Sequence, residues 1–310
     1  MSQQTYKIRN YRPSDFDEYV NLHIEAEKLD RSGLCTSRQG LREYLGRPAY
    51  NPEKDLFIAE ASGRIVGLLN ITPELIMRRV LLDCLVHPQH RRKGLAKRLL
   101  ERVTQRAKEL EVEVMQVNVL EENTVARDVI SRLGFYIVRQ FLEMSLSLSE
   151  AKLPDISNSE FTLRYLQRGE EERLAQIQNR SFADTWGFNP NTPEEIAYAL
   201  NLSSAATTDV VLIYDAARPV GYCWTKINRE KSAETGKEKG RIFMLGVDPD
   251  YRKRGIGRLA LRAGLSYLKE KDIGIVELTV DSENPAACSL YKSFGFQVTA
   301  RSFYYEKRVD

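Results

Sequence analysis

The chain has 310 residues, of which 42% are hydrophobic and 29% are charged. This length is too great for one ordinary core and suits two domains of roughly 150 residues each. The 46 basic and 43 acidic residues leave a net charge of +3, which argues against a broad nucleic-acid surface.

Targeting and metal signals are also missing from the sequence. No apolar run approaches the roughly 20 residues of a membrane span, and the first nine residues lack the pattern of a secretory signal. Four cysteines and three histidines show neither disulfide density nor metal-ligand spacing. We therefore predict a soluble, reduced, cytoplasmic protein with no metal, no nucleic-acid partner and no membrane contact; its oligomeric state stays open.

The predicted elements of the first half begin with a strand at residues 6–9 and an amphipathic helix. A hairpin follows at residues 56–59 and 65–71, then a strand at 80–86. Leu95, Leu99, Val103 and Ala107 recur at helical spacing, and a strand at 112–120 comes next. A short helix, a Gly-Phe turn and alternating residues at 142–148 close the half.

The second half repeats this order, with strands at residues 161–164, 210–214, 220–227, 242–247 and 275–280. Residues 228–240 predict an elongated hairpin tip, and residues 149–159 read as a linker. Strand, helix and strand in that order predict one parallel pair inside a mostly antiparallel sheet. The fold class is therefore α/β, an α+β mixed sheet flanked by helices, in two tandem domains at 1–149 and 160–310 joined by 150–159.

One block of this repeat is aligned without gaps, 161 residues apart. Its shared residues are Val86, Pro88, Arg91, Gly94, Asn123, Gly134 and Phe135, which recur as Val247, Pro249, Arg252, Gly255, Asn284, Gly295 and Phe296. At the same offset, Ile130 of the first copy corresponds to Tyr291 of the second. A hydroxyl is therefore present in one copy alone, which favours the second half as the place of the chemistry.

Each copy places a basic, glycine-containing loop between a strand and a helix. The loops are Arg91, Arg92, Lys93, Gly94, Leu95 and Ala96 in the first copy, and Arg252, Lys253, Arg254, Gly255, Ile256, Gly257 and Arg258 in the second. Glycine at the mouth of a helix lets backbone N–H groups approach an anion, and the helix dipole adds positive potential. A solvated turn, or contact with nucleic-acid phosphates, is the alternative interpretation of either loop alone.

These loops and the motif Asn284-Pro285-Ala286-Ala287-Cys288-Ser289-Leu290-Tyr291 strongly resemble the GNAT superfamily of acyl-CoA N-acyltransferases. The resemblance spans both halves, so the chain resembles a tandem GNAT protein. It implies that acetyl-CoA is the acyl donor and an amine the acceptor. It also implies that the basic loops and Asn284 contact CoA, while Leu245, Gly246 and Val247, or Cys84, Leu85 and Val86 in the first copy, bind the pantetheine arm and polarise the thioester.

The resemblance further implies that Tyr291 is the general acid for the departing thiolate. Its alternative role is a core residue, because Ala287, Leu290, Tyr291 and Phe294 share one helical face. Ile130 cannot donate a proton, so we expect the first domain to be catalytically degenerate and the second to be catalytic.

The general base and the acceptor site are less defined. A related tandem member of the family carries a glutamate at the start of the strand leading to Leu245, where this chain has Arg241. Asp281, Glu238, Asp184 or a water chain are possible replacements. Asp184 and Trp186 lie in a segment that corresponds to a family acceptor loop, although Trp186 has an interface role as its alternative.

The predicted function is acetylation of a primary amine on a small molecule. The alternatives are acetylation of a protein lysine or amino terminus, and a non-catalytic acyl-CoA-binding module.

Overall fold

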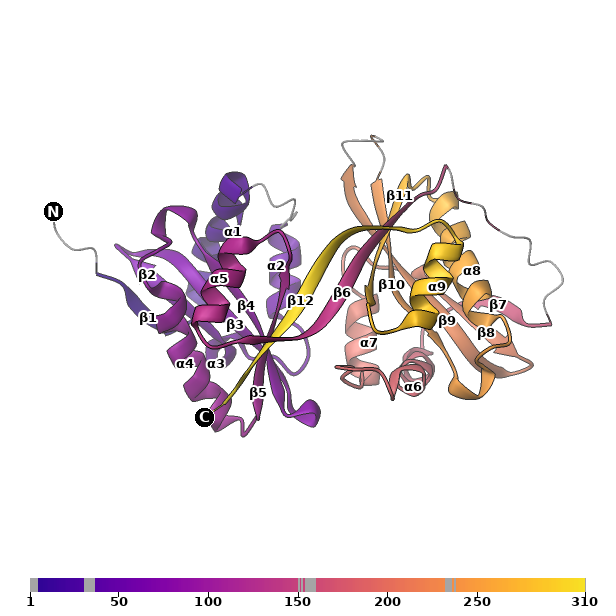
Figure 1. The fold of residues 1–310 in the computed structure, drawn as a ribbon, viewed down its shortest axis with the longest axis horizontal. Coiled ribbons are helices and arrows are strands. Elements are labelled where there is room, and N and C mark those ends of the chain that lie inside the picture. Colours follow the sequence, from indigo (N-terminus) through magenta and orange to yellow (C-terminus); the bar gives the residue numbers. More distant parts are fainter. Residues whose placement is uncertain are drawn as a thin grey trace. The chain divides into compact units, whose positions relative to one another are not determined.

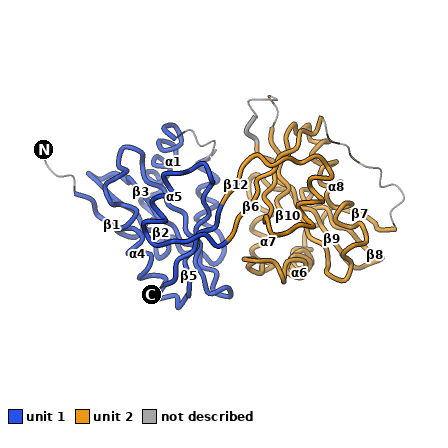
Figure 2. Tube along the Cα trace, viewed as in Figure 1, with its two compact units in different colours: residues 1–138, 303–310 blue, residues 139–302 orange. Residues whose placement is uncertain are grey.

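A computed structural model describes residues 5–30, 37–149, 151, 153, 160–231, 236 and 238–309 of the chain. The chain forms two compact units (Figure 2). The first contains residues 1–138 and 303–310, and the second contains residues 139–302. No helix in the described part of the chain is long and apolar enough to cross a membrane.

The first unit is a sheet in the order β1-β2-β3-β4-β5-β12 (Figure 1). Its strands are β1 (Lys7–Asn10), β2 (Leu56–Ala61), β3 (Arg64–Glu74), β4 (Arg79–Val86), β5 (Val114–Leu120) and the end of β12 (Gln297–Arg308). Its helices are α1 (Phe16–Asp30), α2 (Arg38–Leu45), α3 (Pro52–Asp55), α4 (Leu95–Glu109) and α5 (Thr124–Arg132).

Alternation along β2 places a core on each face of this sheet. Leu56 and Ile58 pack with α1 and α2, whereas Phe57 and Ala59 pack with α4. The predicted stripe of α4 is confirmed, because all four of its residues are buried. Period-two alternation of this kind is what a sheet covered on both faces requires.

The second unit repeats the arrangement in the order β12-β6-β11-β10-β9-β8-β7. Its strands are β6 (Tyr136–Ser147, mostly in this unit), β7 (Thr162–Tyr165), β8 (Val210–Asp215), β9 (Arg218–Lys231), β10 (Glu238–Val247), β11 (Ile275–Asp281) and the start of β12. Its helices are α6 (Glu171–Phe182), α7 (Pro193–Leu200), α8 (Ile256–Glu270) and α9 (Pro285–Ser293). One core packs against α8 and α9, and the other against α6 and α7.

The predicted parallel pair is confirmed in both units. β4 pairs with β5 in parallel, β10 pairs with β11 in parallel, and the other registered pairs are antiparallel. The extended hairpin at residues 228–240 is formed by the ends of β9 and β10, with residues 232–235 and 237 outside the described residues.

The compact units and the predicted domains divide the chain at different places. β6 pairs residue by residue with β11, from Phe141 opposite Asp281 to Ser147 opposite Ile275, so residues 139–149 join the second unit. Residues 303–310 join the first. Most of the predicted linker, residues 150, 152 and 154–159, lies outside the described residues. The boundaries 1–149 and 160–310, taken as limits of the sequence repeat, stay a prediction.

Candidate active site

In both units the parallel strands pair at one end and then separate. β4 and β5 are registered from Arg79–Val114 to Leu81–Gln116, and β10 and β11 from Lys239–Ile275 to Arg241–Glu277. Beyond these positions no pairing joins the two strands among the described residues. The last residues of β4 and β10 therefore present one backbone edge that is free to bind an extended ligand.

The predicted pantetheine-binding residues lie on these unpaired edges. Leu245, Gly246 and Val247 end β10, and Cys84, Leu85 and Val86 end β4. A register shift between Ile242 and Met244 marks a bulge in β10, whereas β3 and β4 pair without interruption. Bulges re-aim the residues that follow them and are frequent beside active sites.

The two basic loops adopt the same backbone conformation. Arg92 and Gly94 have φ values of 60° and 74°, and Lys253 and Gly255 have φ values of 63° and 81°. The first backbone bonds of the two helices run from Arg98 to Gly94 and from Leu259 to Gly255. The N–H groups of Leu95 to Lys97 and of Ile256 to Arg258 donate to no other described residue and suit an anion.

The first arginine of each loop has partners within the protein. Arg91 pairs with Asp30 and donates to the carbonyl of Val86 at 3.1 Å. Arg252 donates to the carbonyl of Ser181 at 2.9 Å. These two arginines therefore attach their loops to the first helix of each unit, a structural role that spacing alone did not reveal.

Two more loop arginines of the second unit are also engaged. Arg254 lies 3.0 Å from Glu160, and Arg258 donates to the Ser293 hydroxyl at 3.0 Å. Lys253, Arg92 and Lys93 have no hydrogen-bond or ion-pair partner in the described part of the chain. They are the side chains most available to a pyrophosphate.

Tyr291 lies on α9 and is 8% exposed. Its ring packs edge-on against Phe296 at 5.8 Å between centroids. Burial, with smaller contributions from Cys223 and Cys288, raises the pKa of its hydroxyl above the ordinary value. The hydroxyl therefore stays protonated at neutral pH and can donate a proton. Ile130, at the same place on α5, packs against the apolar core of the first unit.

The asparagines at the start of these helices have a structural role. Asn284 accepts a hydrogen bond from the N–H of Ala287 at 3.0 Å, and Asn123 accepts one from Ala126 at 3.0 Å. Both are helix N-caps, which explains their presence in both copies. Contact of Asn284 with CoA stays a prediction.

Arg139 brings together two of the predicted acceptor-site residues. Its guanidinium lies 2.8 Å from Asp281 and 5.6 Å from the centroid of the Trp186 ring. Asp281 also accepts from the N–H of Glu283 at 2.9 Å. Its carboxylate is thus already occupied, which weakens its case as a base. Asp184 is exposed.

Arg241, at the position where a related tandem member of the family carries a glutamate, also lies in a charged cluster. It contacts Thr279 and lies 3.5 Å from Glu143, and Thr279 donates to Glu143 at 2.7 Å. Glu238 begins β10, and its carbonyl accepts from Gly274 at 3.3 Å.

Lys226 is a functional candidate that the sequence analysis missed. Its ammonium lies 3.3 Å from the centroid of the Phe243 ring and 5.8 Å from that of Trp224. Burial, followed by the charge of Arg241, lowers the pKa of Lys226 to about 8. The signal available in the sequence was a lysine two residues after a tryptophan on one face of a strand.

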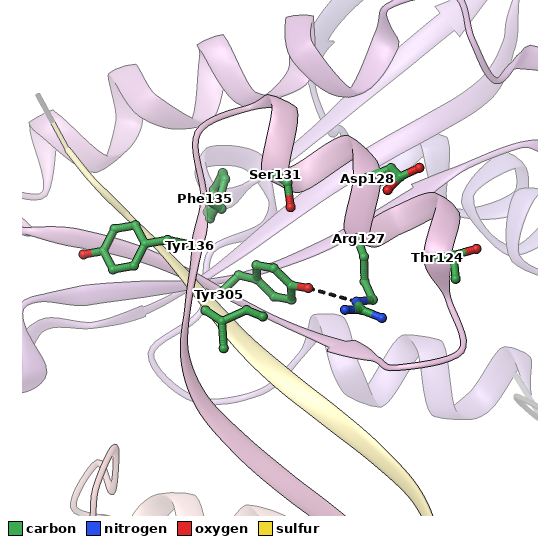
Figure 3. Close-up of a pocket in the computed structure, with 8 residues that line it drawn as sticks. Thr124, Arg127, Asp128, Ser131, Phe135, Tyr136 and Tyr305 are labelled. Atoms are coloured by element: carbon green, nitrogen blue, oxygen red, sulfur yellow. Dashed lines mark hydrogen bonds between the residues drawn. The ribbon is translucent and has the colours of Figure 1, made fainter.

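A pocket of about 420 Å³ lies in the first unit, away from the predicted cofactor residues. It is lined by Thr124, Arg127, Asp128, Ser131, Phe135, Tyr136, Ile137 and Tyr305 (Figure 3). Arg127 points to Tyr305 and donates to its hydroxyl at 3.0 Å. This pocket shares no residue with the splayed strands or the basic loop. Among the residues that the structure describes, no cluster of His, Cys, Asp or Glu could hold a metal ion.

Each unit has two parallel strands that separate before a basic loop, and a glycine begins the helix after that loop. This arrangement defines the class of acyl-CoA-binding transferases. A model of the Acetyltransferase (GNAT) family matches residues 20–135 and 172–296. The chain belongs to this family, as a tandem member. GNAT acetyltransferases use acetyl-CoA as the acetyl donor, and the free amides and cations described above fit such a ligand.

Individual relatives agree with this assignment. The chain is 28% identical over 307 residues to a mycothiol acetyltransferase of Saccharomonospora viridis, covering 91% of this chain and 97% of the relative. A GCN5-related N-acetyltransferase structure from Sphaerobacter thermophilus has a TM-score of 0.71 at 20% identity and covers 98% and 96% of the two chains. A tandem GNAT protein of the clavulanic acid biosynthesis pathway has a TM-score of 0.72 at 15% identity and covers 99% of each chain. The predicted family and fold are therefore confirmed.

Proposed function

We propose that the second unit transfers the acetyl group of acetyl-CoA to a primary amine of a small molecule by direct attack. The observation that carries the proposal is the buried Tyr291, which belongs to the core against which Leu245 and Val247 of β10 pack, whereas the first unit has Ile130 at the matching position. The name of the Saccharomonospora viridis relative, mycothiol acetyltransferase, supports a small-molecule acceptor.

The chain's own groups divide the work of this reaction. Backbone N–H groups at the end of β10 stabilise the negative charge that develops on the thioester oxygen. The free amides of α8 and Lys253 hold the pyrophosphate. Tyr291 donates its proton to the departing thiolate, and the proton returns to Tyr291 from solvent.

The same positions assign a supporting role to the first unit. Its loop and splayed strands fit CoA as those of the second unit do, but Ile130 offers no proton. We infer that the first unit is catalytically degenerate.

The test incubates the full chain with acetyl-CoA and a panel of amines and measures free thiol. The panel contains small amino compounds, lysine peptides and peptides with free amino termini. Thiol release with a small amine, and an acetylated product by mass spectrometry, is the expected outcome. Faster turnover of peptides than of small amines would show that the acceptor is a protein. CoA binding without thiol release from any amine would show that the chain is a binding module and not an enzyme.

A further inference from the structure

Buried polar atoms without partners gather where α6 meets β9 in the second unit. They are Gln178 Nε2, Ser181 Oγ, the Tyr222 hydroxyl and Trp224 Nε1, none of which bonds to a described residue. Gln178 and Tyr222 are fully buried. Since native proteins satisfy nearly all buried polar atoms, four in one place require an explanation.

The cluster touches the strand segment that we assign to the thioester. Tyr222 is the register partner of Gly246. A Cβ on Gly246 would lie 2.5 Å from the Tyr222 ring, 2.8 Å from Ser181 Cβ and 2.9 Å from Ser181 Oγ. The absence of a side chain at position 246 is therefore what lets the tyrosine ring and the serine lie against β10.

The first unit shows that the fold does not need these polar groups. Gly246 corresponds to Leu85 at the offset of 161 residues. Tyr222 corresponds to Leu68, because Leu68 pairs with Leu85 in the first unit as Tyr222 pairs with Gly246 in the second. Leu68 is buried in the apolar core under α1 and Leu85 packs against the same core. The second unit therefore has a large polar residue and a glycine where the first has two leucines, with an unpartnered hydroxyl as the result.

The two tyrosines of the second unit serve different faces of its sheet. Tyr291 belongs to the core under α8 and α9, and Tyr222 to the core under α6 and α7. Burial, then Cys223 and Tyr291, raise the pKa of Tyr222 well above its ordinary value. Because Tyr222 thus stays neutral, it cannot remove a proton itself, but its hydroxyl can orient a water molecule.

We propose that Tyr222, Ser181 and Gln178 hold the water that takes the proton from the acceptor amine, on the sheet face opposite Tyr291. This inference rests on the proposed function. The amine loses one proton to this water and through it to solvent, its nitrogen forms the bond to the acetyl carbon, and the carbon–sulfur bond breaks. The sulfur then receives the proton of Tyr291, so atoms and charge balance.

Gln178 completes the site. Its side chain reaches the Tyr222 hydroxyl and lowers the pKa of that group, although Gln178 Nε2 makes no hydrogen bond of full geometry. A bridging water supplies the missing bonds to the tyrosine, the serine and the amide, which are enough partners for an ordered buried water. The arrangement also supplies a proton route where Arg241 replaces the glutamate of a related tandem protein.

The test compares Tyr222→Phe with Tyr267→Phe. Tyr267 is a matched control, because it is a buried tyrosine of the same unit whose hydroxyl donates to Asp209 at 2.7 Å. Tyr222→Phe removes an unsatisfied group, so we expect an unchanged or higher Tm, at least a tenfold loss of kcat and a rate maximum shifted to higher pH. Tyr267→Phe should lower Tm and leave kcat and the pH profile unchanged.

Ser181→Ala provides a second variant and should shift the pH profile in the same direction. Unchanged kcat and pH profiles in both variants would overturn the inference, and so would a loss of kcat without any shift. If these variants behave as wild type while Tyr291→Phe is inactive, the water site fails and the proposed function stands. If wild type acetylates no amine, both fail.

Discussion

In the first unit, Glu25 of α1 lies 3.4 Å from His87 after β4, whereas in the second unit Arg180 of α6 lies 2.7 Å from Asp248 after β10. The acidic residue lies on the helix in the first unit and after the strand in the second, but the same two elements are joined. Ile130 and Tyr291 differ in another way, because Tyr291 can donate a proton and Ile130 cannot. The comparison teaches that a contact which joins a helix to a loop can be made by different residue types, whereas proton donation is lost when an alkyl side chain replaces the tyrosine.

The largest expected effect concerns the end of β12, which the second half supplies to the first unit. There Tyr305 is 3% exposed, Glu306 accepts from Gln116 at 2.8 Å and Lys307 donates to the carbonyl of Leu133 at 2.8 Å. Deleting residues 303–310 should lower the free energy of unfolding of the first unit by about 5 kcal/mol, which is comparable to the stability of a whole domain. Hydrogen exchange in β5 would measure it.

The matched control for this deletion is Tyr305→Phe, which keeps the buried ring and removes only the bond from Arg127. It should cost about 1 kcal/mol. Full protection of β5 in the truncated chain would show that the first unit does not need this strand.

The second prediction addresses Tyr291 against Ile130. Tyr291→Phe should lower kcat by about 10²- to 10⁴-fold, because it removes the acid and keeps the ring. Ile130→Val, a conservative change at the matching position, should leave turnover within about twofold. Steady-state thiol release measures both, and equal rates for wild type and Tyr291→Phe would remove the tyrosine from the mechanism.

A third prediction tests whether the Gly246 and Tyr222 pair of the second unit is equivalent in packing to the leucine pair of the first. Gly246→Ala places a Cβ 2.5 Å from the Tyr222 ring, so the free energy of unfolding should fall by about 1–3 kcal/mol. The double change Gly246→Leu with Tyr222→Leu copies the leucine pair of the first unit. In urea unfolding it should recover part of the stability lost by Gly246→Leu, because the contact with Ser181 remains, and it should not recover activity. Loss of stability equal to that of Gly246→Leu alone would contradict the equivalence of the two pairs.

The smallest effect concerns Lys226. Its pKa of about 8 in the folded state lies below that of the unfolded chain, so the unfolded state binds more protons between about pH 8 and 10.5 and stability rises with pH across that window. Lys226→Met removes the cost of burying the charge and should stabilise the protein by about 1–2 kcal/mol at pH 7 and by less at pH 10. Chemical denaturation at the two pH values measures the difference; an equal gain at both would assign it to packing.

Local sequence signals predicted the elements well, because hairpins, helical stripes and glycine-initiated loops are short-range features. Gly94 and Gly255 were found by spacing and adopt the positive φ that their place requires. The separation of β10 from β11 could not be predicted from local signals, since no residue in either strand specifies where pairing stops.

The partners of individual side chains could not be predicted in the same way. Arg91 and Arg252 read as phosphate ligands, yet they attach to α1 and α6, because contacts across sixty or seventy residues depend on tertiary packing. Tyr222 was also missed. Within β9 it reads as an ordinary strand tyrosine, and only the alignment with Leu68 and the contact with Gly246 set it apart.

The exchange of strand ends also has a consequence for synthesis on the ribosome. The first unit needs residues 303–310, which are translated only after residues 139–302 have been added. At about 5–20 residues per second, this delay is roughly 10–30 s. During that time the edge of β5 lacks its neighbour, so the first unit should be open to chaperones, or to pairing with another nascent chain, until the last strand is made.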